Sequence, residues 1–222
     1  MNHFGFKAVG RLTVKEFQLE WRNKTLVTGM LIYVVSTVFI CYLAFRQIVD
    51  VPTWNALFWI IMVFAAVNAV ARSFMQESGG IQLYYYTLLH PATVILSKIL
   101  YNFLLLLTLA LVNLLFYSLF LGNLIGDLPM FLSGLILGSL GLSSILTLVS
   151  AIASKAGNSP SLMAILSFPI LLPLLMTIMR FSKNAIDGLG WTVNGNYGIA
   201  LGGLGVMVIA LSYLLFPYLW KD

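Results

Sequence analysis

The sequence predicts an all-α integral membrane protein with six transmembrane helices, and three observations support this class. Sixty per cent of the 222 residues are apolar and only 9% are charged. A soluble domain is usually about half apolar and a quarter charged, so one soluble core could not bury this much apolar surface. Six apolar stretches are long enough to cross a bilayer, and basic residues gather on one side of them. Lipid is therefore expected to be the solvent for most of the chain.

The first element is the N-terminal segment, residues 1–25, which is too polar to span a membrane. Helical spacing places its cations on one stripe, with apolar side chains beside them and acids opposite. The cations are Lys7, Arg11, Lys15 and Arg22, and their apolar neighbours are Phe6, Val14, Phe17 and Trp21. This pattern favours an interfacial helix on the inner leaflet, with its cations at anionic headgroups. Alternatively, the cations only set the topology, and the two interpretations can hold together.

Residues 26–222 are expected to form one six-helix transmembrane domain. Each span has roughly the 20 apolar residues that a bilayer core requires of a helix. The predicted spans are residues 26–45, 54–71, 92–121, 130–153, 161–181 and 198–219. Glycine, proline and acidic residues separate the spans, and the last gap is expected to run from Asp187 to Gly198.

The distribution of lysine and arginine predicts the orientation. With six spans, nine of the twelve such residues fall on the side of the termini, and the other side carries only Arg46, Arg180 and Lys183. Segments rich in these residues stay on the inner side of the membrane. Both termini are therefore expected in the cytoplasm, with the chain in the bacterial cytoplasmic (inner) membrane. The charge follows the topology, and no nucleic-acid partner is expected.

The sequence lacks the motifs of several catalytic classes. It has no GxxxxGK[ST] phosphate loop, no GxSxG and no HExxH, so the chain is expected to be a non-catalytic subunit. The single cysteine, Cys41, excludes an intrachain disulfide and a CxxC redox pair. His90 is interpreted as a loop histidine, with an axial haem ligand as the alternative. No predicted span holds a central charged residue, which argues against a carrier that works by proton relay.

Small residues at helical spacing mark two of the predicted spans. Gly134 and Gly138 form a GxxxG pattern in span four, and Gly198 and Gly202 form another in span six. Such patterns let helix backbones approach closely where no hydrophobic force draws helices together. We interpret them as packing sites within one subunit. A dimer interface with a second copy of the chain is the alternative.

Two prolines, Pro169 and Pro173, lie four residues apart in span five. Each removes a backbone donor and bends the helix. A kinked helix could line a conduit or act as a gate, and the alternative is that the membrane helix simply tolerates its prolines. Three span asparagines are interpreted as interhelical hydrogen-bonding residues rather than substrate ligands: Asn68, Asn102 and Asn113.

A polar segment, residues 72–91, interrupts the apolar chain between spans two and three. Gly79-Gly80 permits a sharp turn, residues 81–89 are expected to form a short helix, and Pro91 suits the first turn of span three. The segment is therefore predicted to be a helix–turn–helix elbow on the membrane surface. Its adjacent tyrosines point in three directions: Tyr84, Tyr85 and Tyr86. At least one should face protein or solvent, where aromatic side chains are favoured anchors for a partner.

The elbow and the LSKILYN stretch at residues 96–102 resemble the CcmB family, the membrane subunit of the ABC-type complex of cytochrome c maturation. The matching elbow residues are Phe74, Glu77, Gly79, Ile81, Leu88 and Pro91. The loop at 155–158 and the twin-proline stretch FPILLPLL at 168–175 are also similar. Ser78 and Gln82 depart from the acidic residues that the family often has at these places.

The resemblance implies an ABC-2-type exporter fold in which residues 72–91 are the cytoplasmic coupling helix. A separate, CcmA-like ATPase subunit would dock on Phe74, Glu77, Gly79, Gly80, Ile81, Tyr84, Tyr85, Leu88 and Pro91. The resemblance also implies a CcmC-like haem-handling partner, with haem exported or delivered, or a haem chaperone released; no resident cofactor is assigned. The alternatives are a general ABC-2-type export permease for lipid, glycan or drug, and an ATP-independent carrier or membrane scaffold. A scaffold would not need a coupling helix.

Overall fold

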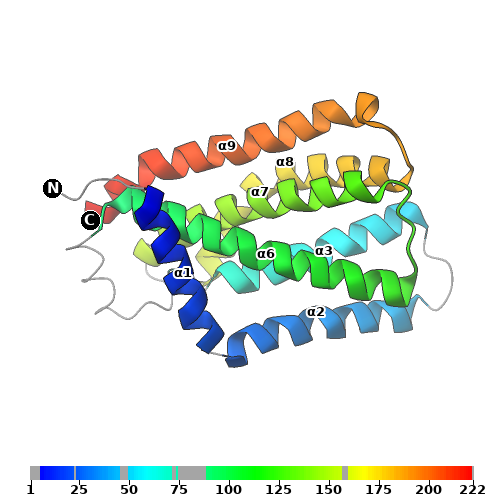
Figure 1. Cartoon of the computed structure of the whole chain (residues 1–222), viewed down its shortest axis with the longest axis horizontal. Coiled ribbons are helices and arrows are strands. Elements are labelled where there is room, and N and C mark those ends of the chain that lie inside the picture. The colour runs from blue at the N-terminus through cyan, green and yellow to red at the C-terminus, as the bar shows by residue number, and fades with distance from the viewer. Residues whose placement is uncertain are drawn as a thin grey trace.

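The computed structural model is a bundle of α-helices. It describes residues 6–22, 24–45, 50–71, 74, 89–156 and 160–221. Within these ranges the helices are α1 (Phe6–Arg22), α2 (Lys24–Ala44), α3 (Val51–Val70), α6 (Pro91–Leu121), α7 (Leu128–Lys155), α8 (Pro160–Ile186) and α9 (Trp191–Lys221). Figure 1 shows α2, α3 and α6 to α9 running along the long axis, while α1 lies obliquely across one end.

Five of the described helices are long and apolar enough to cross a membrane: α3, α6, α7, α8 and α9. In α2 the apolar part whose side chains the structure describes, Thr28–Ala44, is shorter. Length and composition together confirm the prediction of an all-α integral membrane protein. The existence of a sixth span stays a prediction; it would be α2, the first of the predicted spans in the chain.

Helix α7 is the centre of the bundle. It packs against α3, α6, α8 and α9. Its apolar span is 78% buried, whereas those of α8 and α9 are each 28% buried. Because α8 and α9 leave most of their apolar surface outward, lipid or other proteins must cover them.

The start of α9 differs from the sequence-based expectation. The predicted gap from Asp187 to Gly198 was wrong, because α9 already begins at Trp191. Asn194, fully buried in the first turns of α9, donates from Nδ2 to the carbonyl of Phe181 in α8 (3.0 Å). This tertiary contact holds a stretch rich in Asn and Gly, WTVNGNYG, as helix although its local propensity is poor.

At the end of the bundle away from α1, the α6–α7 connection is fastened to the end of α8. The backbone N–H groups of Gly126 and Asp127 donate to the carbonyls of Ile186 (3.0 Å) and Ala185 (2.9 Å). Asp127 also caps α7, since its Oδ1 accepts from Met130 N (3.0 Å). The last turn of α8 therefore finds partners for carbonyls that lack them within the helix.

Candidate functional site

The predicted elbow lies mostly outside the described residues. The structure places two of the predicted coupling residues, Phe74 near the start of the segment that joins α3 to α6 and Pro91 at its end. The other seven lie outside the described residues: Glu77, Gly79, Gly80, Ile81, Tyr84, Tyr85 and Leu88. The described geometry therefore concerns the base on which the elbow stands, and the helix–turn–helix form of the elbow stays a prediction.

The start of α6 is fixed by its own sequence. Pro91 occupies the first turn, where its missing N–H costs no hydrogen bond. His90 is the N-cap, and its Nδ1 accepts from the backbone N of Ala92 at 3.3 Å. Histidine is thus used here to satisfy one of the free donors of a helix N-terminus.

Phe74 anchors the base of the elbow in a small apolar cluster. This anchor cluster consists of Phe74, Val94, Ile95, Ile99, Ala151 and Phe216, with Trp220 packed against it. Phe74 is 6% exposed, and its ring centroid lies 5.6 Å from that of Phe216. The cluster joins the connection after α3 to the start of α6, the end of α7 and the end of α9.

Lys98 of α6 adds a cation to this cluster. Its side chain is 2% exposed, and its Nζ lies 4.7 Å from the centroid of the Phe74 ring. A cation over an aromatic face is attracted by the ring quadrupole, and the attraction is stronger where water is excluded. From the sequence alone, Lys98 is one of the nine basic residues that predict the topology. Its place in the LSKILYN stretch was the signal that it belongs with the elbow.

Helix α1 packs against the same end of the bundle. Val9 and Thr13 are buried on α1, and Thr13 Oγ1 lies 3.4 Å from the carbonyl of Ser97 in α6. On the outward side, Val14 and Phe17 are exposed. Helix α1 therefore has one face on α6 and another that is exposed. This arrangement suits the predicted interfacial helix, which stays a prediction.

The two glycine pairs occupy different environments. A Cβ at Gly134 would lie 2.9 Å from Phe181 Cδ1, and a Cβ at Gly138 would lie 2.7 Å from Trp59 Cη2. This face of α7 is therefore closely packed against α8 and α3 of the same chain. Gly198 is looser, at 3.4 Å from Phe181 Cε2, and a Cβ at Gly202 would meet nothing within 4 Å.

The two prolines inside α8, Pro169 and Pro173, lie on its outer face. The helix continues through Pro169 and Pro173 from Pro160 to Ile186. Pro169 and Pro173 are exposed, and the carbonyl of Pro173 accepts from Thr177 Oγ1 at 2.7 Å. Within this chain the prolines face away from the core. A conduit that involved them would need a second wall from another molecule.

A buried polar network, which sequence reasoning missed, ties α3 to α8. Asn55 Nδ2 donates to the Met179 carbonyl (2.7 Å), and its Oδ1 lies 2.7 Å from Ser182 Oγ. Ser182 Oγ also accepts from Trp59 Nε1 at 2.9 Å. Each of these residues is unremarkable in the sequence, since only the fold brings residues 55–59 and 179–182 together.

The predicted asparagines divide between the core and the surface. Asn102 Nδ2 donates to Thr147 Oγ1 of α7 at 2.8 Å, and Asn113 Nδ2 lies 3.5 Å from the Phe58 carbonyl of α3. Asn68 is exposed on α3. Among the described residues, no group of three or more His, Cys, Asp or Glu side chains could hold a metal ion. Asn102 and Asn113 thus link α6 to its neighbouring helices.

These features define a multi-pass, all-helical membrane protein in which the connection between two membrane helices is anchored on the rest of the bundle. The sequence of residues 7–218 matches the CcmB protein family. The chain therefore belongs to the CcmB family, whose members are membrane transport proteins of cytochrome c-type biogenesis. No similar sequence was found among curated proteins.

Proposed function

We propose that this chain is the membrane subunit of an ABC transporter complex for cytochrome c maturation. In this role it couples ATP hydrolysis by a separate, CcmA-like ATPase subunit to haem export or delivery, or to release of a haem chaperone. The observation that carries the proposal is the family match, which extends over nearly the whole chain. A CcmC-like membrane protein would be the partner that handles haem.

The anchor cluster supports a mechanical role for the elbow. An ATPase that moves residues 72–91 would pull on Phe74, which is packed against α6 and α9 and lies under Lys98. Because packed interiors resist compression, such a movement would shift these helices rather than be absorbed locally. The ATPase stroke would thus reach the membrane part of the complex through Phe74.

The proposal includes an ABC-2-type arrangement with six spans, of which α2 is the first. Its orientation places both termini, α1 and the elbow in the cytoplasm, with the chain in the bacterial inner membrane. The basic residues counted along the chain support this orientation. In this arrangement the elbow is on the side where ATP is available.

Deletion of the chain tests the haem assignment. We expect c-type cytochromes to be lost from the membrane fraction, as measured by haem staining, because no other chain would pass on the ATPase stroke. Restoring the full chain from a plasmid should restore them. Unimpaired c-type cytochromes in the deletion strain would refute the assignment and leave the general ABC-2-type export permease as the better hypothesis.

A further inference from the structure

Helix α8 has an apolar face that the described parts of the chain leave exposed. This twin-proline face consists of Ile165, Phe168, Pro169, Leu172, Pro173 and Met176. Their spacing of three and four residues places them on one side of the helix. A proline has no N–H, so it leaves the carbonyl four residues before it without its helical donor. On this face the carbonyls of Ile165 and Pro169 therefore lose their helical partners.

The structure shows no substitute donor for either carbonyl within the described chain. The neighbouring hydroxyl, Ser167 Oγ, donates to the carbonyl of Ala164 instead (3.1 Å). In the part of the chain that the structure describes, no side chain donates to the carbonyl of Ile165 or Pro169. Two acceptors, about 6 Å apart along the helix, are thus left open.

Both open carbonyls lie within the hydrocarbon layer. Helix α8 has 27 residues and is therefore about 40 Å long, against about 30 Å for a hydrocarbon core. Ile165 and Pro169 follow its first residue by five and nine positions, which places them roughly 8 and 14 Å from that end. Membrane helices tolerate proline where neighbouring helices, hydroxyl side chains or waters satisfy the freed groups. The twin-proline face therefore requires a cover that carries hydrogen-bond donors.

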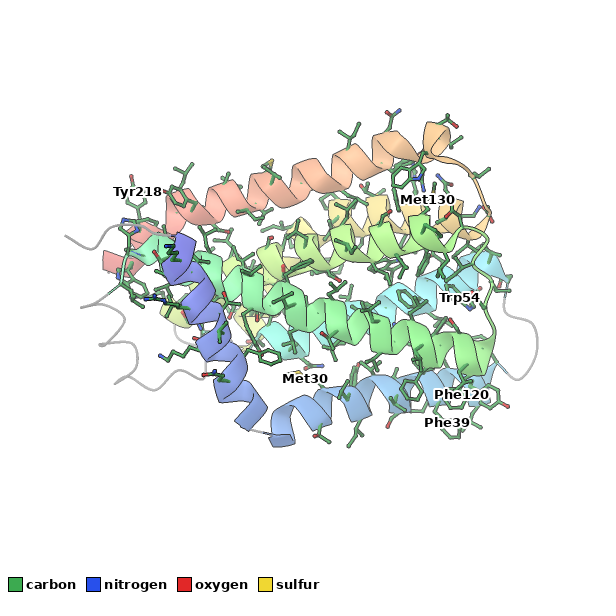
Figure 2. The ribbon with its side chains drawn as sticks, in the orientation of Figure 1. Met30, Phe39, Trp54, Phe120, Met130 and Tyr218 are labelled. Carbon is green, nitrogen blue, oxygen red and sulfur yellow. The ribbon has the colours of Figure 1, made fainter. Side chains whose placement is uncertain are left out.

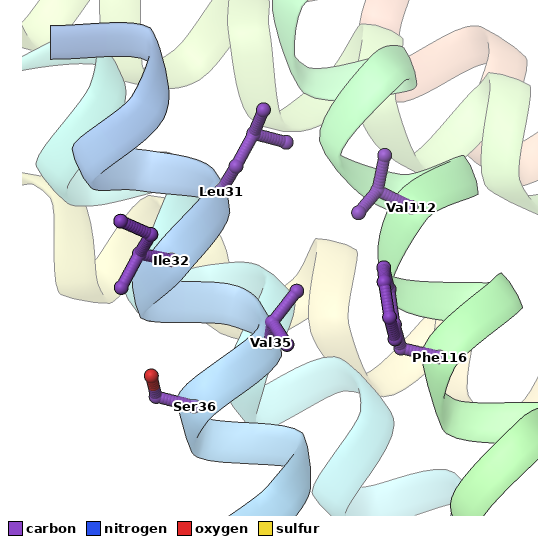
Figure 3. A pocket seen from close by; sticks show the side chains of 6 residues that line it. All are labelled: Leu31, Ile32, Val35, Ser36, Val112 and Phe116. Carbon is purple, nitrogen blue, oxygen red and sulfur yellow. The ribbon is translucent and has the colours of Figure 1, made fainter. Parts of the chain in front are cut away.

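The apolar surface of α2 and α6 has no such requirement. Helix α2 contains no proline, and α6 has one only at its first residue. Five hydrocarbon side chains and one hydroxyl side chain line the groove between these helices (Figure 3): Leu31, Ile32, Val35, Val112, Phe116 and Ser36. Further along, Phe39 of α2 packs on Phe120 of α6 with ring centroids 5.8 Å apart (Figure 2). Lipid tails can cover this side, because the carbonyls within these spans keep their helical donors.

Lipid, water and a second copy of the chain do not meet the requirement of the twin-proline face. Acyl chains carry no donors, and a buried water needs several polar partners, which the hydrocarbon side chains around the carbonyls do not supply. Two copies in one membrane have the same orientation, so a twofold axis would bring the same face together at the same depth. The side chains of this face have no N–H or O–H group, so a second copy would add only hydrocarbon.

We propose that the twin-proline face of α8 is the docking site for a transmembrane helix of a different protein. Amide or hydroxyl side chains of that helix donate to the carbonyls of Ile165 and Pro169. These donors are uncharged, because a charged group is far more costly at this depth. The proposal rests on α8 alone and does not depend on the haem assignment.

Photocrosslinking in phosphatidylcholine vesicles tests the docking site. The full chain, with a photoreactive residue in place of Leu172, is reconstituted with a synthetic transmembrane peptide of about 20 residues in a large excess of lipid. One peptide has a leucine core, and the other has two asparagines one turn apart in that core. We expect at least about threefold more crosslinking to the asparagine peptide, since each hydrogen bond between membrane helices favours association by roughly that factor. Equal crosslinking of the two peptides would overturn the proposal.

Two controls separate the freed carbonyls from nonspecific association. A photoreactive residue in place of Ile40, 63% exposed on α2, should crosslink both peptides equally. In the Leu172 experiment, the variant Pro169→Ala/Pro173→Ala regains both N–H donors and should lose the preference for asparagine. This variant should fold, because alanine is a better helix former than proline. A preference that persists in the variant, or an equal preference at Ile40, would overturn the proposal.

The same photoreactive residue in cell membranes separates the alternative occupants. We expect a crosslink to a different polypeptide that is lost in Pro169→Ala/Pro173→Ala. A covalent dimer of the chain, lipid adducts alone, or a polypeptide adduct that survives in the variant would overturn the proposal. Rapid reaction of Leu172→Cys with a charged thiol reagent, in a Cys41→Ser background, would place water on this face and also overturn it.

Discussion

Phe74 is the described residue that connects the elbow to the membrane helices. It is an aromatic side chain at the polar end of a span, and sequence alone offers several uses for such a residue. In the structure its ring is buried against Phe216 and lies under the ammonium of Lys98. The ring is therefore an internal anchor, and under the proposed function the surface for an ATPase would come from other residues of the segment.

Replacing Phe74 by Ala should lower stability strongly. Truncation of a buried Phe to Ala removes its packing and typically lowers the free energy of unfolding by about 3–5 kcal/mol. The measurement is the free energy of unfolding in a detergent titration, with Phe64→Ala as control because Phe64 is 57% exposed on α3. Phe74→Leu should recover part of the loss, because it restores bulk but not the ring face. Equal losses for Phe74→Ala and Phe64→Ala would contradict the anchor.

At the scale of the helix, the glycines show how one sequence pattern serves two environments. Both GxxxG pairs predict a closely packed face. On α7 that face is filled by Trp59, Phe181 and Ile178, whereas Gly202 on α9 has open space around it. Sequence gives the same pattern for both, because the distinction depends on which helix lies opposite.

Gly138→Ala is expected to destabilise the chain by roughly 1–3 kcal/mol. The Cβ of the new alanine would lie 2.7 Å from Cη2 of Trp59. The indole of Trp59 is rigid and buried, and its Nε1 donates a hydrogen bond to Ser182 Oγ at 2.9 Å. The comparison is Gly202→Ala, which meets nothing and gains helix propensity of up to about 1 kcal/mol. Detergent unfolding measures both. If Gly138→Ala were as stable as Gly202→Ala, the tight packing of α7 would be disproved.

At the scale of the whole molecule, the fold gathers the ends of α6, α7 and α9 and the connection after α3 into one region. Helix α1 covers the same end through its contact with α6. Figure 1 shows both ends of the chain on this side of the bundle. Under the proposed orientation, all of these parts meet the cytoplasm together, beside the elbow.

Two elbow variants test the docking of an ATPase. Gly79→Pro removes the freedom to turn, and Tyr85→Ala removes an aromatic anchor. We expect each to reduce copurification of the ATPase subunit with the tagged chain. Tyr218→Ala is the control, since Tyr218 is 74% exposed at the end of α9. Normal recovery of the ATPase with both elbow variants would count against docking on residues 72–91.

The sequence predicted the bounds of the five long apolar helices to within a few residues, except for the start of α9. Hydrophobic length is a local property, so composition is enough to find such helices. The stretch from Trp191 to Tyr197 was misread because its Asn and Gly residues are common in loops. Its helix depends on the contact of Asn194 with α8, which no local pattern contains.

The sequence by itself determined that this chain belongs in a membrane, where its helices lie, and which family it belongs to. Apolar length, charge asymmetry and the spacing of elbow residues are properties of the chain as written. Only the tertiary structure decided that α7 is central, that Pro169 and Pro173 face outward, and that Phe74 and Lys98 meet. These facts depend on which side chains from distant helices share one space, and close packing in three dimensions alone selects those neighbours.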